Sequence, residues 1–350
     1  MSGSPATAAP AVPTASGTLR KVALDTGEFT SARLTAVNRR GEIVGVLRDP
    51  EANGGVRAAL WRRYDTMIDL GVPGELPTAL NNRGDVLIAD LIWTNGSLRP
   101  VRHPTLSARP TDLNDHLQVT GTLESGSLYE YRAFRWQDGQ FTDLGTPYPD
   151  AYTRGQAINN RGTVLGTVHD AVVQPVGFVW RDGVTSVFGA GLHQIAPIDI
   201  NDRDQVLSYG SATEESPVHP YLWQRGKLVD LMAGRAADGI PQDINNAGDV
   251  VGSIDSRPVL WRAGRTIHLL PPAWRGLATH TNERGDIAGV AGTGTDNRVF
   301  LWRNGHVRFS EPETGTFNRP SVAGVDERGR VAGGLGDELT GENHPVVWIP

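Results

Sequence analysis

The stretch AINNRGTVLG, residues 157–166, is followed after a short loop by GFVWRDG, residues 177–183. Between two short apolar runs lies a turn in which Asn159 can cap backbone N–H groups and Gly162 can supply a positive φ angle. β-prone runs on either side of such a turn predict a β-hairpin, and the aromatic run that follows predicts a third strand.

Variants of this stretch recur along the whole chain. The turn asparagine is found at Asn38, Asn81, Asn114, Asn159, Asn201, Asn245 and Asn282, with Asp326 in its place in the last copy. The tryptophan of the third strand is found at Trp61, Trp93, Trp136, Trp180, Trp223, Trp261, Trp302 and Trp348. We number these copies repeats 1 to 8 and expect their tryptophans to pack between neighbouring repeats.

The spacing of the repeats predicts a β-propeller. The distance between neighbouring turn positions ranges from 33 residues, between Asn81 and Asn114, to 45 residues, between Asn114 and Asn159. A β repeat of about 40 to 45 residues is typical of one four-stranded blade. In repeat 1 we expect strands at 34–37, 42–47, 58–62 and 67–70. The chain therefore predicts an eight-bladed propeller, with seven blades as the alternative if the short repeat 2 is not a full blade.

The two ends of the sequence suggest how the ring closes. Repeat 8 ends with VVWIP at 346–350, before a fourth strand could form. The segment LRKVALD at 19–25 precedes repeat 1 and resembles a fourth strand. We expect this N-terminal strand to complete the last blade, so that no sheet edge is left exposed there.

The pattern Ala-x-Ile-Asn-Asn-x-Gly-x-Val-x-Gly, followed by an aromatic-hydrophobic-Trp-x-x-Gly segment, resembles the HAF repeat of bacterial proteins described as probable extracellular repeat proteins. The resemblance runs from about residue 34 to the C-terminus and implies a propeller-like fold, but the family offers no catalytic motif to transfer. Three repeats depart from the pattern: Leu117 and Asp204 replace the turn glycine, and Ile88 replaces a small residue. Either function has overwritten the repeat there, or the sequence has drifted.

The composition is that of one folded all-β domain. The 350 residues are 39% hydrophobic and include 42 glycines and 23 prolines, as expected of short strands joined by many turns. We expect one propeller domain over 18–350 and a disordered, Ala/Pro-rich N-terminus over 1–17. That segment lacks the basic and apolar regions of a signal peptide. The sequence as written therefore predicts a cytoplasmic protein, and a secreted protein with a processed N-terminus is the alternative.

Charge and motif content narrow the classes of function. A formal net charge of -6 does not favour binding to nucleic acid or to anionic membranes. No apolar run reaches the roughly 18 residues that span a bilayer. The chain has no cysteine, no HxH or HExxH spacing, and no P-loop, Rossmann fingerprint or G-x-S-x-G motif. We expect no metal, no cofactor, no nucleic-acid partner and no membrane insertion.

Arginines recur just before the turn asparagine, where the innermost strands of a propeller approach the channel mouth. Arg33, Arg109 and Arg154 stand five places before it, and Arg319 lies slightly further upstream in repeat 8. Guanidinium groups gathered around one axis suit a carboxylate or phosphate ligand. These four arginines are candidate ligand-binding residues, with ordinary solvated arginines as the alternative.

Ionisable residues replace a small residue two places before the turn asparagine. Asp112, Asp199, Asp243 and His280 stand where repeats 1, 2 and 4 carry alanine. In a shared cavity they could act as general acids or bases, with pKa values shifted by burial and mutual repulsion. The alternative is that each aspartate caps a local turn or accepts a backbone N–H bond.

Two aromatic residues lie in loops between repeats. Trp274 stands outside the repeat pattern, in the segment 270–276 between repeats 6 and 7, and Tyr152 belongs to the segment 148–154 between repeats 3 and 4. Both are candidates for ligand contact, with packing over the propeller face as the alternative for Trp274.

These observations favour a monomeric, non-catalytic propeller that binds a small anionic or peptide-like ligand, or a protein partner, at the channel mouth. The alternative is a cofactor-free enzyme of cyclase, lyase or isomerase type that uses the Asp, His and Arg residues of the channel mouth. A deep pocket closed at its base would favour the enzyme, and an open channel or flat face would favour the binding protein.

Overall fold

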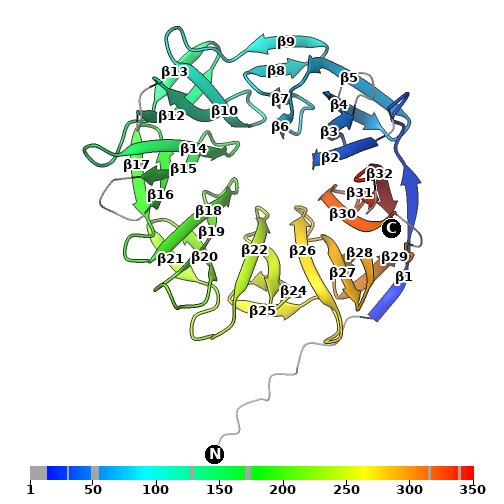
Figure 1. Ribbon diagram of the computed structural model, residues 1–350. Coiled ribbons are helices and arrows are strands. Elements are labelled where there is room, and N and C mark those ends of the chain that lie inside the picture. Colours follow the sequence, from blue (N-terminus) through cyan, green and yellow to red (C-terminus); the bar gives the residue numbers. More distant parts are fainter. Residues whose placement is uncertain are drawn as a thin grey trace, which may run out of the picture.

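The computed structural model describes residues 14–29, 31–48, 55–126, 130–169, 175–313, 317–337 and 340–350. Within these ranges the regular elements are strands, β1 to β32, and Figure 1 shows them arranged in a ring. The described residues include no helix long and apolar enough to cross a membrane. The fold is an all-β propeller.

Each repeat contributes strands in order from the centre outward. The innermost strands are β2 (Ser31–Val37), β6 (Pro77–Leu80), β10 (Ser107–Leu113), β14 (Tyr152–Ile158), β18 (Gln194–Ile200), β22 (Gly239–Ile244), β26 (Arg275–Thr281) and β30 (Phe317–Val325). The second strands are β3 (Ile43–Arg48), β7 (Val86–Ile88), β11 (Val119–Glu124), β15 (Val164–His169), β19 (Val206–Ser211), β23 (Val250–Ile254), β27 (Ile287–Thr293) and β31 (Val331–Asp337).

The third strands carry the repeat tryptophans: β4 (Val56–Arg63), β8 (Leu91–Thr94), β12 (Tyr131–Gln137), β16 (Val176–Arg181), β20 (His219–Gln224), β24 (Arg257–Arg262), β28 (Asp296–Arg303) and β32 (Asn343–Ile349). The outermost strands are β5 (Thr66–Pro73), β9 (Ser97–Pro100), β13 (Gln140–Asp143), β17 (Val184–Phe188), β21 (Lys227–Asp230), β25 (Arg265–His268) and β29 (His306–Ser310). The strands expected in repeat 1 are all present, each slightly displaced or longer than predicted.

Repeats 1 to 6 form six separate four-stranded antiparallel sheets, including the short repeat 2. Repeats 7 and 8 share one eight-stranded sheet in the order β26-β27-β28-β29-β1-β32-β31-β30. β1 (Thr14–Ala23) pairs antiparallel with β32, with Lys21 opposite Trp348, which confirms that an N-terminal strand joins the last sheet. Its first half also pairs parallel with β29, a contact that the sequence did not predict. β1 begins inside the Ala/Pro-rich segment 1–17, and residues 1–13 lie outside the described residues.

The first two strands of each repeat are joined by the predicted turn. Gly162 has φ 75°, in the left-handed region that glycine occupies without strain. Leu117 and Asp204, which replace the turn glycine, hold φ 57° and 59°. The turn is therefore retained in these irregular repeats, although a side chain in this conformation costs about 1 kcal/mol or more.

The core lies between the sheets. All eight repeat tryptophans are buried, with none more than 7% exposed. Trp180 of repeat 4 packs with Ala133 of repeat 3, and Trp223 of repeat 5 packs with Leu165 and Val179 of repeat 4. The expected packing role of these tryptophans is confirmed.

A relay of asparagine side chains joins neighbouring repeats. The Oδ1 atom of Asn201 accepts the backbone N–H groups of Arg203 and Gln205, both at 3.0 Å, which closes its own turn. Its Nδ2 atom donates to the carbonyl oxygen of Asn245, the turn asparagine of the next repeat, at 2.9 Å. The same donation runs from every turn asparagine to the following repeat, at 2.7 to 3.1 Å.

The last step of this relay differs from the others because Asp326 has no amide to donate. Arg330 binds the Asp326 carboxylate and donates from Nη2 to the carbonyl oxygen of Arg40 in repeat 1, at 3.3 Å. The backbone N–H of Glu327 also reaches the carbonyl oxygen of Arg39, at 3.4 Å. Repeat 8 is thereby tied to repeat 1 by a cation instead of an amide.

The relay can be tested with Asn201→Asp. The carboxylate keeps both turn acceptors but loses the donor to Asn245, and places a buried charge beside a carbonyl oxygen. We expect the free energy of unfolding to fall by about 2 to 4 kcal/mol in urea titrations near pH 7. The matched control is Asn304→Asp at an exposed turn position, which should change stability by less than about 0.5 kcal/mol. Equal stability of the two variants would rule out a stabilising role for the amide.

The closing strand can be tested at Leu19, which is 2% exposed on β1 and packs against Trp348 and Leu335. Leu19→Ala should lower the free energy of unfolding by about 2 to 5 kcal/mol. Hydrogen exchange should accelerate first in β29 and β32, the two partners of β1. The control is Arg20→Ala at the exposed neighbouring position. Uniform acceleration over all sheets would contradict a local role in closure.

Candidate functional site

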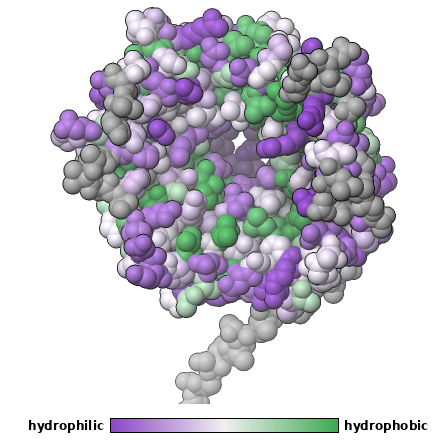
Figure 2. Space-filling model, in the orientation of Figure 1, coloured by the Kyte–Doolittle hydropathy of each residue, from purple (hydrophilic) through white to green (hydrophobic). Residues whose placement is uncertain are grey.

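The innermost strands surround a central hollow, and Figure 2 shows hydrophobic side chains gathered on the side of it where β18, β22 and β26 lie. Each innermost strand carries a register shift just before its turn, such as that between Gly155 and Ala157 in β14. Two sets of residues on these strands are candidates for a site. The first set is the ionisable residues two places before each turn asparagine, and the second is the residues five places before it.

The structure brings the predicted Asp and His residues together. Each side chain is only partly exposed, and burial raises the pKa of Asp112 to about 7. Burial, followed by the charge of Asp243, raises the pKa of Asp199 well above its usual range. Burial also raises the pKa of Asp243 and lowers that of His280, while their opposite charges offset part of both shifts.

Two of these carboxylates accept backbone N–H groups from two neighbouring repeats. Asp112 accepts the N–H of Leu113 and that of Ile158 in the next repeat, both at 2.8 Å. Asp243 likewise accepts the N–H of Ile244 at 2.8 Å and that of Thr281 in the next repeat at 2.7 Å. Asp112 and Asp243 therefore each link their own repeat to the next one by hydrogen bonds. Asp199 accepts only the N–H of Ile200, at 2.7 Å, among the hydrogen bonds of the described residues.

A polar cavity of about 200 Å³ lies at the end of the channel where the turns meet, and both Asp112 and Asp199 line it. Arg39 reaches into this cavity from repeat 1 and pairs with Glu283 of repeat 7 at 2.6 Å and with Asp202 of repeat 5 at 3.7 Å. Sequence reasoning missed Arg39 because the ion pair joins residues from three repeats. Among the described residues no group of three His, Asp or Glu side chains is placed to hold a metal ion.

The four predicted arginines lie on four different innermost strands, β2, β10, β14 and β30. Arg33 and Arg319 are exposed on β2 and β30. Arg109 pairs with Glu124 of its own sheet at 2.7 Å. None of these arginines, nor Arg154, lines the polar cavity at the turn end.

Arg154 and Tyr152, both predicted ligand contacts, do lie together. The Arg154 guanidinium stands 4.8 Å from the ring centroid of Tyr131 and 5.7 Å from that of Tyr152. Tyr152 stacks on His169 at 4.8 Å, and burial lowers the pKa of His169, with the nearby Arg154 charge lowering it further. This aromatic cluster holds the arginine in place.

Trp274, the tryptophan outside the repeats, stacks on Phe309 of β29 with ring centroids 4.2 Å apart. It also packs against the buried cluster of repeats 6 and 7. In the structure Trp274 therefore packs against the sheets of repeats 6 and 7.

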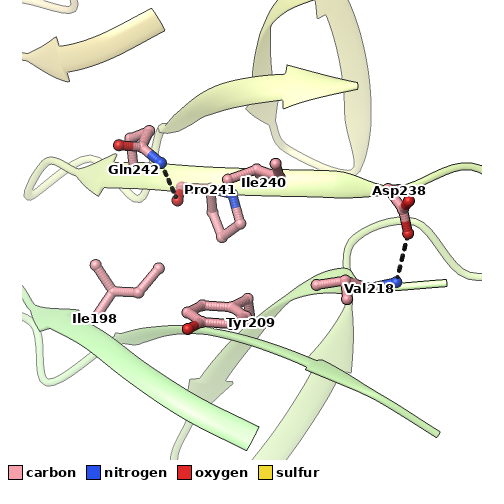
Figure 3. Close-up of a pocket in the computed structure, with 7 residues that line it drawn as sticks. All are labelled: Ile198, Tyr209, Val218, Asp238, Ile240, Pro241 and Gln242. Carbon is pink, nitrogen blue, oxygen red and sulfur yellow. Dashed lines mark hydrogen bonds between the residues drawn. The ribbon is translucent and has the colours of Figure 1, made fainter. Parts of the chain in front are cut away.

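An apolar groove of about 550 Å³ lies between repeats 5 and 6. Figure 3 shows Ile198 and Tyr209 on one wall, facing Ile240 and Pro241 of β22 on the other. At its rim the Asp238 carboxylate accepts the N–H of Val218 at 2.9 Å, and the Gln242 amide donates to the Pro241 carbonyl at 3.1 Å.

Sequence reasoning missed this groove, although one signal was present. Five places before the turn asparagine, where repeats 1, 3 and 4 carry arginine, repeat 6 carries Ile240, which is 51% exposed. Ile240 differs from a single exposed residue because Ile198, Tyr209 and Pro241 lie around the same cavity and extend the apolar surface.

No family model matches the chain, and no curated protein matches its sequence. Among solved structures, it is similar to Pyrococcus horikoshii acylaminoacyl peptidase, with 13% identity and a TM-score of 0.52 over 91% of this chain and 60% of that one. It is also similar to Porphyromonas gingivalis dipeptidyl peptidase 4, with 12% identity and a TM-score of 0.55 over 89% of this chain and 58% of that one. The chain thus spans less than two thirds of these peptidase chains, and the similarity shows the fold alone.

The raised pKa of Asp112 predicts a pH dependence of stability. Because the folded pKa, about 7, exceeds the unfolded value, about 4, the contribution of this group is fully present below pH 4 and is lost as pH rises to 7. The stability of the natural protein relative to Asp112→Ala should therefore fall by roughly 3 kcal/mol between pH 4.5 and 8. Urea titrations measure this difference, and alanine is the natural residue here in three repeats. A difference that does not change with pH would contradict the raised pKa.

Proposed function

We propose that this protein is a non-catalytic propeller that binds a peptide-like ligand, with an apolar side chain of the ligand seated between repeats 5 and 6. The observation that carries this proposal is the groove walled by Ile198, Tyr209, Ile240 and Pro241. Its volume of about 550 Å³ falls within the range of about 300 to 1,000 Å³ that is usual for ligand pockets.

The polarity of the groove favours a peptide over a plain hydrocarbon. β22 pairs only with β23, so its channel-facing edge leaves backbone groups unpaired in the sheet. Such an edge can hydrogen-bond an extended peptide while a neighbouring pocket takes a side chain. The Tyr209 hydroxyl and the Gln242 side chain add polar contacts beside the apolar walls.

The repeat position of Ile240 favours a ligand that also carries a negative charge. The equivalent residues are Arg33, Arg109 and Arg154 in repeats 1, 3 and 4, and all three are exposed on innermost strands. Because equivalent repeat positions lie at similar depths in the ring, the mouth has a basic side and an apolar side. A ligand with an apolar side chain and a carboxylate matches both.

We also propose that the ring has eight blades and that its repeats are of the HAF type. Repeats 7 and 8 would then be two blades joined through β1. This count is supported by the eight innermost strands and by the eight buried tryptophans. The four-stranded sheet of repeat 2 supports eight blades over seven.

The alternative, a cofactor-free enzyme of cyclase, lyase or isomerase type, rests on the shifted pKa values of Asp199, Asp243 and His280. It is less well supported than binding, because Asp112 and Asp243 each use both carboxylate oxygens to hold backbone N–H groups. Only Asp199 keeps an oxygen that accepts no hydrogen bond among the described residues. Catalytic acids and bases need an oxygen that is free to exchange a proton with the substrate.

The groove is tested with Ile240→Arg, which introduces the residue natural to this position in repeats 1, 3 and 4 and fills the cavity. Saturation-transfer NMR with N-acetylphenylalanine amide should detect binding at about millimolar affinity to the natural protein. The variant should lose this binding at least about tenfold. The control is Leu76→Arg, the same change at the equivalent exposed position of repeat 2, which should bind like the natural protein.

Two further probes complete the test. N-acetylphenylalanine, with its free carboxylate, should bind several-fold more tightly than the amide, and N-acetylglycine should bind far more weakly than either. Equal amide binding by the natural protein and by Ile240→Arg would refute the proposed groove. Failure of the free acid to exceed the amide would remove the role of the arginines but not that of the groove.

A further inference from the structure

We propose a second binding site in this protein, for a small organic oxyanion. It lies between repeats 4 and 5 near the turns, and we call it the oxyanion groove. This cavity of about 550 Å³ is lined by four arginines, Arg161, Arg181, Arg203 and Arg225. Two acidic residues, Asp182 and Asp204, line it as well. The lining therefore carries two more positive than negative charges, in a chain whose formal net charge is -6.

Two of the four guanidinium groups are already engaged. Arg181 pairs with Asp204 at 2.8 Å and with Asp182 at 3.5 Å, and Arg161 reaches Asp204 at 3.5 Å. Arg203 and Arg225 are exposed, and neither forms an ion pair in the part of the chain that the structure describes. Like charges brought to one cavity without partners suit an anion that neutralises both.

One lining residue of the groove, Asp204, departs from the repeat pattern. Asp204 stands where most repeats carry the turn glycine, and its carboxylate accepts the Asn159 amide at 2.9 Å and the Thr163 hydroxyl at 2.8 Å. The same carboxylate holds Arg181 at 2.8 Å. Asp204 thus joins repeats 4 and 5 and fixes the position of one arginine in the cavity.

In the three earlier grooves the equivalent space is covered by an arginine. The guanidinium groups of Arg62, Arg99 and Arg135 lie over the rings of Trp93, Trp136 and Trp180, at 4.9 to 5.7 Å. Among the described residues no guanidinium lies over Trp223, the corresponding tryptophan of this groove. With Arg181 drawn to Asp204, the space above Trp223 and Val179 remains available for a ligand.

A second cavity between repeats 5 and 6, separate from the apolar groove and close to the turns, shows what the arginines add. This cavity has a volume of about 330 Å³, and Arg262 binds the Asp249 carboxylate there through two hydrogen bonds at 2.7 and 2.5 Å. Ala247 and Ala263 occupy the positions that Arg203 and Arg225 hold in the oxyanion groove. The repeat therefore tolerates alanine at both positions, and the two arginines are additions to the scaffold.

The chemistry of the cavity indicates the class of ligand. A phosphate group can accept hydrogen bonds from two guanidinium groups that approach from different directions. Val184, which is 66% exposed, and Val179 provide an apolar wall for the carbon portion of the ligand. We therefore expect an aryl or alkyl phosphate to fit better than inorganic phosphate or a simple carboxylate.

The experiment compares phenyl phosphate, inorganic phosphate, benzoate and phenol by isothermal titration calorimetry at low and moderate salt. The natural protein should bind phenyl phosphate most tightly, and the affinity should fall as salt increases. The double variant Arg203→Ala/Arg225→Ala should bind phenyl phosphate at least about tenfold more weakly. Its thermal unfolding should match that of the natural protein, because repeat 6 carries alanine at both positions.

The control variant is Arg284→Ala, the turn position of repeat 7 that corresponds to Arg203; it should bind phenyl phosphate like the natural protein. Ile240→Arg should also leave this binding unchanged, which separates the oxyanion groove from the apolar groove. Equal affinity of the natural protein and the double variant for phenyl phosphate would overturn the proposal. So would the absence of saturable binding of phenyl phosphate to the natural protein.

Discussion

The structure depends on one repeated interaction, the donation of an asparagine side-chain amide to the backbone of the next repeat. The turn asparagine is buried, so each polar atom that it carries needs a partner. Its oxygen closes its own turn and its nitrogen reaches the next turn, as Asn201 does toward Asn245. A single residue therefore specifies both the hairpin and the distance between neighbouring sheets.

A ring built from such links has one joint that cannot be another copy, because the last repeat must meet the first. Here the amide relay ends at Asp326, whose carboxylate binds Arg330, and the arginine completes the contact to repeat 1. At the outer edge, β1 supplies the strand that repeat 8 lacks and also pairs with β29. The ring is therefore closed in two places: by an ionic contact between repeats 8 and 1 near the channel, and by the shared strand β1 at the outer edge.

Much of this architecture could be predicted because its rules are local. Asn159 and Gly162 identify a hairpin from adjacent positions, and the recurrence of Trp180 identifies the packed third strand. The pairing of β1 with β29 could not be predicted, since nothing in either strand selects a parallel partner. Likewise, the sequence indicated that Asp112 and Asp243 share a channel position, but not that the next repeat supplies N–H donors to both.

The grooves were missed for a different reason, which bears on how such a scaffold acquires function. Ile240 and Tyr209, or Arg181 and Arg225, come from different repeats or different strands, and only the ring places them together. Because the relay fixes the sheets, a substitution at an exposed repeat position changes a groove without moving the frame. Asp204 acts on both the frame and a groove. It keeps the turn at φ 59° and hydrogen-bonds to Asn159 of repeat 4, and it also binds Arg181 in the groove. Asp204 thus shows that one substitution in a repeat can preserve the turn and the contact between repeats while it changes the position of an arginine in a groove.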